Sequence, residues 1–122
     1  MYTLYVDSFF WTGHSVLLPD GSPESVHNHN FCATARLTAD RLDGRAMVMD
    51  FCTLKESLDA ITGEFTRTGN IGRIDYFAKN AQTAEIIAEY IFKKLEPALP
   101  KGVTLEEIIV TEEPNSRAGY TK

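Results

Sequence analysis

Three histidines are the residues in this sequence best suited to chemistry. His27 and His29 are one residue apart, and His14 is the only other histidine in the chain. On an extended segment, side chains two residues apart point the same way, so the pair presents its imidazoles together. Three neutral imidazoles are the protein ligands of a catalytic zinc site, which keeps a fourth position open. The alternative is a set of solvated rings at a strand end or in a loop.

The segments around these histidines predict two neighbouring strands. Residues 2–12 are rich in aromatic and β-branched side chains and predict a strand that ends near His14. A turn-rich segment at 15–25 would bring the chain back to a second strand at His27–Ala39, in which apolar residues alternate. If the strands pair, His14 and His27 share one end of a sheet. We therefore expect one shared site, and imidazole ligands favour zinc.

The central part of the chain predicts a turn, a third strand and a first helix. Asp43-Gly44 is a turn signal, and Ala46–Met49 is expected to be the third strand of an antiparallel meander. Asp50 is placed to cap a helix over residues 51–65, where apolar side chains recur every three to four positions. Residues 66–79 are expected to be irregular.

The last part of the chain predicts a second helix and two strands. Asn80 is expected to cap the helix, assisted by Thr83 or Glu85, and prolines stop it. Strands are expected at 103–112 and 117–121. Segregated strands and helices predict an α+β domain, with helices covering one face of an antiparallel sheet.

Composition limits the classes of function. The chain has 122 residues, of which 43% are hydrophobic and 24% charged, so we expect one domain over residues 1–122. Its net charge of −5 argues against a nucleic-acid partner and a membrane surface. No apolar run has the length of a membrane span, and Asp7 interrupts the first apolar stretch, so no signal peptide is expected. We expect a cytoplasmic protein.

The two cysteines do not suggest a disulfide framework. Cys32 and Cys52 lack the spacing of a metal or redox motif and are expected to be reduced, partly buried thiols. Cys32 is close to the histidine pair in sequence, so it is also a candidate ligand or nucleophile. Its position in the strand argues against this role, because residue 32 faces away from residues 27 and 29.

Five segments, in order and at compatible spacings, resemble one known family. Phe10–His14 looks like the family motif Phe-x-Ala-Ala-His, and His27–Phe31 looks like His-Gly-His-Asn-Tyr. Ala46–Lys55 looks like Gly-Met-Val-x-Asp-Phe-x-x-Leu-Lys. Asn80–Glu85 looks like Asn-Pro-Thr-x-Glu, and Val110–Tyr120 looks like Val-x-Glu-Thr…Tyr. The family comprises 6-pyruvoyl-tetrahydropterin synthase and its bacterial relative 6-carboxy-tetrahydropterin synthase. The fourth segment has one residue more than the family motif.

The resemblance implies a fold, an assembly and a set of site residues. It implies a tunnelling-fold domain, in which two helices pack on one face of a four-stranded antiparallel sheet, and a homo-oligomer that is a trimer or a dimer of trimers. It implies zinc on His14, His27 and His29. It also implies a pterin substrate anchored by Glu112, with Thr83 nearby in the substrate site. A carboxylate can accept the two parallel hydrogen bonds that a pterin offers.

The sequence departs from the family at its proton-transfer residues. The synthases carry a cysteine a few residues before the histidine pair, and residues 22–26 contain none. They also carry an Asp-His pair after the first helix, and neither partner is present near residues 65–68. Some divergent members have a glutamate three residues before the pair of histidines, in place of the cysteine. These members are linked to cleavage of the dihydroneopterin side chain.

Glu24 has the spacing of that glutamate. A carboxylate next to a zinc-held hydroxyl could act as general base, whereas the alternative is a surface glutamate in a turn. The resemblance implies a zinc-dependent lyase-type enzyme that acts on dihydroneopterin triphosphate or a related reduced pterin, by elimination or side-chain cleavage. The missing cysteine and Asp-His pair support an alternative, a non-catalytic zinc-containing relative that binds a pterin or purine-like ligand.

Overall fold

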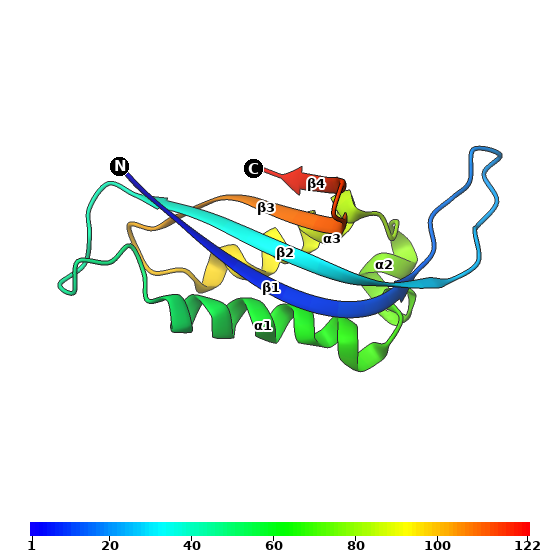
Figure 1. Cartoon of the computed structure of the whole chain (residues 1–122), viewed down its shortest axis with the longest axis horizontal. Helices are drawn as coiled ribbons and strands as arrows, with labels where there is room; N and C mark the ends of the chain where they lie inside the picture. Colours follow the sequence, from blue (N-terminus) through cyan, green and yellow to red (C-terminus); the bar gives the residue numbers. More distant parts are fainter.

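Four antiparallel strands form one sheet, and two long helices cover one of its faces (Figure 1). The computed structural model describes all residues from 1 to 122. The strands lie in the order β1-β2-β3-β4. The strands are β1 (Tyr2–His14), β2 (His27–Ala39), β3 (Thr104–Glu113) and β4 (Ser116–Tyr120), and the helices are α1 (Phe51–Thr68) and α3 (Ala84–Leu95). The predicted α+β class with a four-stranded sheet is confirmed.

Alternation along the first two strands builds the core. The even-numbered side chains of β1 from Leu4 to His14 are buried under the helices. On β2 the buried side chains are the odd-numbered ones from Phe31 to Ala39. Helix α1 packs on β1, and α3 packs on β3 and β4. The strands therefore bury one face and leave the other exposed, as the period of two predicts.

The expected third strand at Ala46–Met49 is wrong. These residues belong to the connection between β2 and α1, where Asp43 organises a turn: its carboxylate accepts hydrogen bonds from the backbone N–H groups of Arg45 and Met47. Ala46 has a left-handed φ of 62°, which no strand accommodates. Moreover, β3 occupies the free edge of β2, with Thr111 opposite Cys32. A short apolar run alone does not make a strand when both edges of its neighbour are already paired.

Helix α1 begins where the sequence predicts and ends later. The Asp50 carboxylate accepts hydrogen bonds from the backbone N–H groups of Cys52 and Thr53, which lower the pKa of Asp50. The helix continues past Gly63 to Thr68 and ends at Gly69, which has a left-handed φ of 71°.

The segment expected to be irregular at 66–79 is largely helical. It contains the end of α1, a 3-10 turn at Ile71–Arg73 and the short helix α2 (Asp75–Lys79).

Asn80 does not cap α3, although the sequence predicted that it would. It follows α2, and its side-chain amide donates to the Tyr76 carbonyl. Thr83 is the cap of α3, because its hydroxyl accepts from the backbone N–H of Ile86 at 3.3 Å. A 3-10 turn at Glu96–Ala98 follows α3. None of the helices combines the length and apolar character that a bilayer crossing requires.

A buried serine joins β1 to α1. Ser8 is fully buried, and its hydroxyl donates to the Asp59 carboxylate at 2.5 Å and lies 2.8 Å from the Thr62 hydroxyl. Lys55 pairs with the same carboxylate. Burial raises the pKa of Asp59, but the hydrogen bonds from Ser8 and Lys55 outweigh it and hold that pKa below its ordinary value of 3.8.

This contact makes the stability of the fold depend on pH. Because the pKa of Asp59 is lowered on folding, its contribution is present above pH 3.8 and is lost as the pH falls through the lowered value. We expect Ser8→Ala to reduce the free energy of unfolding by about 1–2 kcal/mol at pH 7. In urea titrations the reduction should shrink as the pH falls from 3.8 through the lowered pKa of Asp59. Thr34→Val, which removes a hydroxyl bonded to exposed Asp7, is the control and should cost under about 0.5 kcal/mol. A Ser8→Ala deficit that stays constant across this range would contradict the link to Asp59.

The cap of α3 should be measurable in the same way. Thr83→Ala leaves the Ile86 N–H without its side-chain acceptor and is expected to lower the free energy of unfolding by about 1 kcal/mol. Thr83→Ser keeps the hydroxyl and should retain most of the stability in chemical denaturation. Equal losses in the two variants would show that the methyl group, rather than the cap, is responsible.

Candidate metal centre

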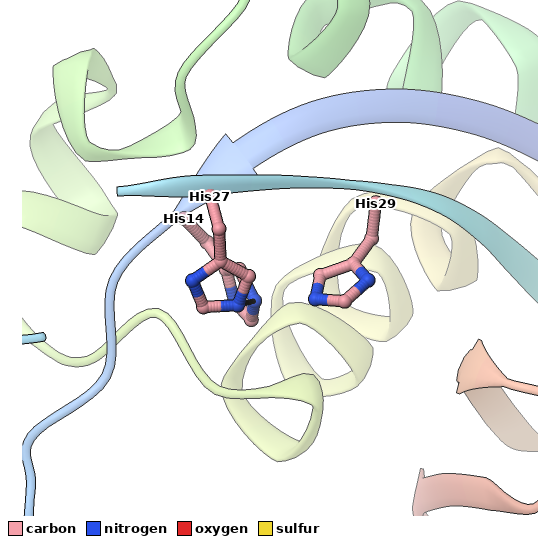
Figure 2. Close-up of side chains that lie close together, drawn as sticks. All are labelled: His14, His27 and His29. Atoms are coloured by element: carbon pink, nitrogen blue, oxygen red, sulfur yellow. Dashed lines mark hydrogen bonds between the residues drawn. The ribbon is translucent and has the colours of Figure 1, made fainter. Parts of the chain in front are cut away.

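The pairing of β1 with β2 brings the three histidines together. His14 lies directly opposite His27, and Thr12 lies opposite His29. One ring nitrogen from each histidine lies within 4.8 Å of the others, so the three could hold a metal ion. Figure 2 shows the His14 and His27 rings close to each other and the His29 ring beside them. The structure thus confirms the predicted meeting of these three residues at one end of the sheet.

His14 is held in one tautomer by a backbone carbonyl. Its side chain is 1% exposed, and Nδ1 lies 2.8 Å from the carbonyl oxygen of Gln82. A carbonyl can only accept, so Nδ1 must carry the proton of the neutral ring. In that neutral ring the lone pair is on Nε2, which lies 3.0 Å from both His27 Nε2 and the Glu112 carboxylate oxygen, a cluster of acceptors that a cation would satisfy.

Hydrogen-bond acceptors also fix the tautomer of His27. Its Nδ1 lies 3.2 Å from the Ser25 carbonyl oxygen and 3.4 Å from Glu24 Oε1, and both are acceptors. Nδ1 therefore donates, and Nε2 carries the lone pair. The Nε2 atoms of His14 and His27 are 3.0 Å apart, so two lone pairs point at one place. Such an arrangement suits a cation, and histidines that ligate metals usually donate their other N–H in this way.

Glu112 adds a carboxylate to this cluster. Its Oε1 lies 3.0 Å from His14 Nε2, and its side chain is partly exposed. Glu112 also lines a hollow of about 560 Å³ between the β1–β2 loop and the start of α3. Thr83 and Gln82 line the same hollow, together with apolar residues such as Phe77 and Val16. The carboxylate that the family resemblance implied is therefore next to both the histidines and a cavity.

A second hollow, of about 600 Å³, lies at the other end of the sheet. Residues 40–43 and 100–103 contribute to it, and it is far from the histidines. Of these two hollows, only the one lined by Glu112 adjoins the histidine cluster, through the contact of Glu112 with His14.

Glu24 is brought next to His27 by the fold of the β1–β2 loop. Its Oε1 accepts from the backbone N–H of Val16 at 3.1 Å, and its carbonyl accepts from the Ser15 hydroxyl at 2.6 Å. Its carboxylate thus contacts the outer nitrogen of His27, Nδ1, rather than the nitrogen that faces the cluster. Glu24 is a fixed neighbour of the candidate site and not a free surface side chain.

The cysteines lie outside the cluster. Cys32 points to the sheet face opposite the histidines, as its position in β2 predicts, and is half-buried. Burial and nearby Asp7 raise the pKa of its thiol, which disfavours the thiolate that a ligand or nucleophile needs. Cys52 is exposed, so its expected partial burial is wrong.

Aromatic rings form the floor of the cluster. The Phe31 ring meets those of His14 and His29 edge to face, at centroid distances of 5.3 and 5.6 Å. Phe31 in turn stacks on Phe10, and Phe10 packs on Phe65 of α1. The rigid core therefore supports the histidines from below, which limits the orientations that their rings can adopt.

Gln82 is the contact that sequence reasoning missed. Besides the carbonyl that holds His14, its side-chain Oε1 accepts from the backbone N–H of Ser15 at 2.9 Å. The only sequence signal was its position next to Thr83, the cap of α3. A contact made by a backbone carbonyl leaves no mark in residue type, so the pattern could not reveal it.

The comparisons with known proteins agree with this geometry. The family model for 6-pyruvoyl tetrahydropterin synthase matches residues 3–122. A curated relative, 6-carboxy-5,6,7,8-tetrahydropterin synthase of Synechocystis, is 30% identical over 115 residues, which cover 91% of this chain and 88% of that protein. The residues matched by the family model include every residue of the cluster.

Solved structures show the same fold. The Caenorhabditis elegans 6-pyruvoyl tetrahydropterin synthase aligns with a TM-score of 0.83 at 19% identity, over 99% of this chain and 95% of that chain. A Plasmodium vivax 6-pyruvoyltetrahydropterin synthase, described as a catalytic residue mutant with glutamate replaced by alanine, aligns with a TM-score of 0.73 at 18% identity, over 99% and 97% of the two chains. These similarities confirm the tunnelling fold, and together with the family match they show that the chain belongs to the 6-pyruvoyl tetrahydropterin synthase family of pterin-processing enzymes.

Proposed function

We propose that this protein is a zinc-dependent lyase-type enzyme that acts on dihydroneopterin triphosphate or a related reduced pterin. One observation carries the proposal: His14 and His27 turn their lone-pair nitrogens toward each other at 3.0 Å, beside His29 and Glu112. Zinc is the metal that this ligand set favours, and when bound it would polarise the side-chain oxygens of the substrate.

Glu112 and Thr83 are proposed to bind the substrate. The carboxylate of Glu112 would accept two parallel hydrogen bonds, from the 2-amino group and a ring N–H of the pterin. Thr83 lines the same hollow, at the N-terminus of α3. The apolar lining contributed by Phe77 would exclude water from the faces of the ring.

Glu24 is proposed to be the general base. It would take a proton from a side-chain hydroxyl of the substrate, the first step of elimination and of side-chain cleavage alike. Two facts support this role: the structure fixes Glu24 next to His27, and a glutamate is described as a catalytic residue in the Plasmodium vivax relative. Its contact with the outer nitrogen of His27 would serve a second purpose, since it also orients that ring.

We further propose that the chain works as a homo-oligomer, a trimer or a dimer of trimers, in the cytoplasm. The open face of β1 carries Tyr5, Phe9 and Trp11, whose side chains are 58%, 74% and 44% exposed. Large apolar side chains grouped on one strand favour burial against another chain. Both edge strands of the sheet also offer unpaired backbone groups for such an assembly.

Metal analysis tests the proposed centre. Purified wild-type protein should hold about one zinc per chain by inductively coupled plasma mass spectrometry. His27→Ala should lose it, because two imidazoles remain. Asn28→Ala changes the next residue, whose side chain points to the other face, and should keep the metal. Wild-type protein that binds no zinc after incubation with the ion would contradict the proposal.

Substitution of Glu24 tests the proposed base. Glu24→Gln keeps an acceptor for the Val16 N–H but cannot take a proton, so zinc content should stay and turnover should fall by about 10²–10⁴-fold. Turnover of dihydroneopterin and of its triphosphate is followed by chromatography. Unchanged turnover in Glu24→Gln would exclude Glu24 as the base. A wild-type protein that binds a pterin but converts neither compound would instead be the non-catalytic relative.

A further inference from the structure

We propose that Gln82 is a positioning residue for the metal centre. Its side-chain amide fastens the segment before α3 to the end of β1, so that its own backbone carbonyl keeps His14 in the tautomer that a metal requires. The inference rests on the proposed metal site, and it assigns a role to a residue that is not one of the metal ligands in that proposal.

Two hydrogen bonds from His14, the last residue of β1, and from Ser15, which follows it, converge on Gln82. The His14 Nδ1–H donates to its backbone carbonyl at 2.8 Å, and the Ser15 backbone N–H donates to its side-chain Oε1 at 2.9 Å. The first bond sets the position of the proton on the ring. The second joins the same two segments through a side chain, and it is the one that a substitution can remove.

The side chain of Gln82 packs closely against Gly72. A Cβ atom at position 72 would lie 2.9 Å from Gln82 Nε2 and 3.3 Å from Gln82 Cδ, closer than side chains normally approach. Gly72 has no left-handed φ, so its backbone does not require glycine. Close packing against the Gln82 amide is therefore a reason for glycine at this position, along with the Asn70 side chain, which would lie 3.0 Å away.

Loss of the side-chain bond should reach the metal through His14. Without Oε1, the N–H of Ser15 loses its partner and the segment that carries the Gln82 carbonyl is no longer fixed. The Nδ1 proton of His14 can then shift to Nε2, which lies 3.0 Å from His27 Nε2 and 3.0 Å from Glu112 Oε1, a carboxylate oxygen that would accept from it. A protonated Nε2 cannot bind a metal. Substitutions of such supporting residues typically weaken metal binding about 10–100-fold.

Two readouts that do not depend on turnover test this role. The first is the affinity for Zn²⁺, measured by competition with a chromophoric chelator. The second is the tautomer of His14 in the metal-free protein, read from the ¹⁵N chemical shifts of its ring. Gln82→Met keeps the size of the side chain and removes the acceptor. Gln82→Glu restores an acceptor oxygen, and Asn80→Ala, in the same segment, is the matched control.

We expect Gln82→Met to bind Zn²⁺ about 10–100-fold more weakly than wild type and to show a mixture of His14 tautomers. Asn80→Ala should match wild type in both readouts. Gln82→Glu should restore the single tautomer; its added charge makes the tautomer, rather than the affinity, the test of rescue. Gly72→Ala should shift both readouts in the direction of Gln82→Met, and it provides a second route to the result if that variant does not fold.

The inference and the proposed metal site fail in different ways. Wild-type affinity and a single His14 tautomer in both Gln82→Met and Gly72→Ala would overturn the positioning role and leave the metal site standing. A wild-type protein without affinity for Zn²⁺ would overturn the metal site, and the tautomers of the variants would still decide whether Gln82 controls His14.

Discussion

The antiparallel register between β1 and β2 is the constraint on which the rest of the site depends. It sets His14 opposite His27 and fixes the face on which His27 and His29 project. A slip of one residue would turn every side chain of β2 to the other face, exposing Phe31 and removing two of three ligands from the cluster. The stacked pair of Phe10 and Phe31 opposes such a slip. Core packing and ligand geometry therefore depend on the same pairing.

Much of the fold is readable from the sequence because local signals and burial agree. Aromatic and β-branched residues predicted β1, alternation predicted β2, and the Asp50 cap predicted the start of α1. The errors fell where tertiary contacts decide. Ala46–Met49 looks like a strand but lies in a turn built by Asp43, since β3 takes the vacant edge of β2. Asn80 resembles a cap, yet the hydroxyl of Thr83 is the group that reaches the first turn of α3.

In the candidate site, too, some features were predictable from the sequence and others were not. Histidine type and spacing predicted the cluster, whereas only the resemblance to the family implied a role for the carboxylate of Glu112, which lies 3.0 Å from His14. The supporting contacts carried no such mark. Gln82 acts on His14 through a backbone carbonyl, and Glu24 contacts the outer nitrogen of His27, which spacing alone could not distinguish from a contact inside the cluster. The arrangement of acceptors around each outer nitrogen is thus a result that only the structure provides.

The central claim is that three imidazoles, with their lone pairs turned inward, bind one zinc ion. X-ray absorption spectroscopy at the zinc edge of the loaded protein tests it most directly. The account predicts scattering from three imidazole nitrogens at about 2.0–2.1 Å, with one further light ligand. A sulfur neighbour at about 2.3 Å, or fewer than three imidazoles, would place the metal elsewhere in the molecule and contradict the account.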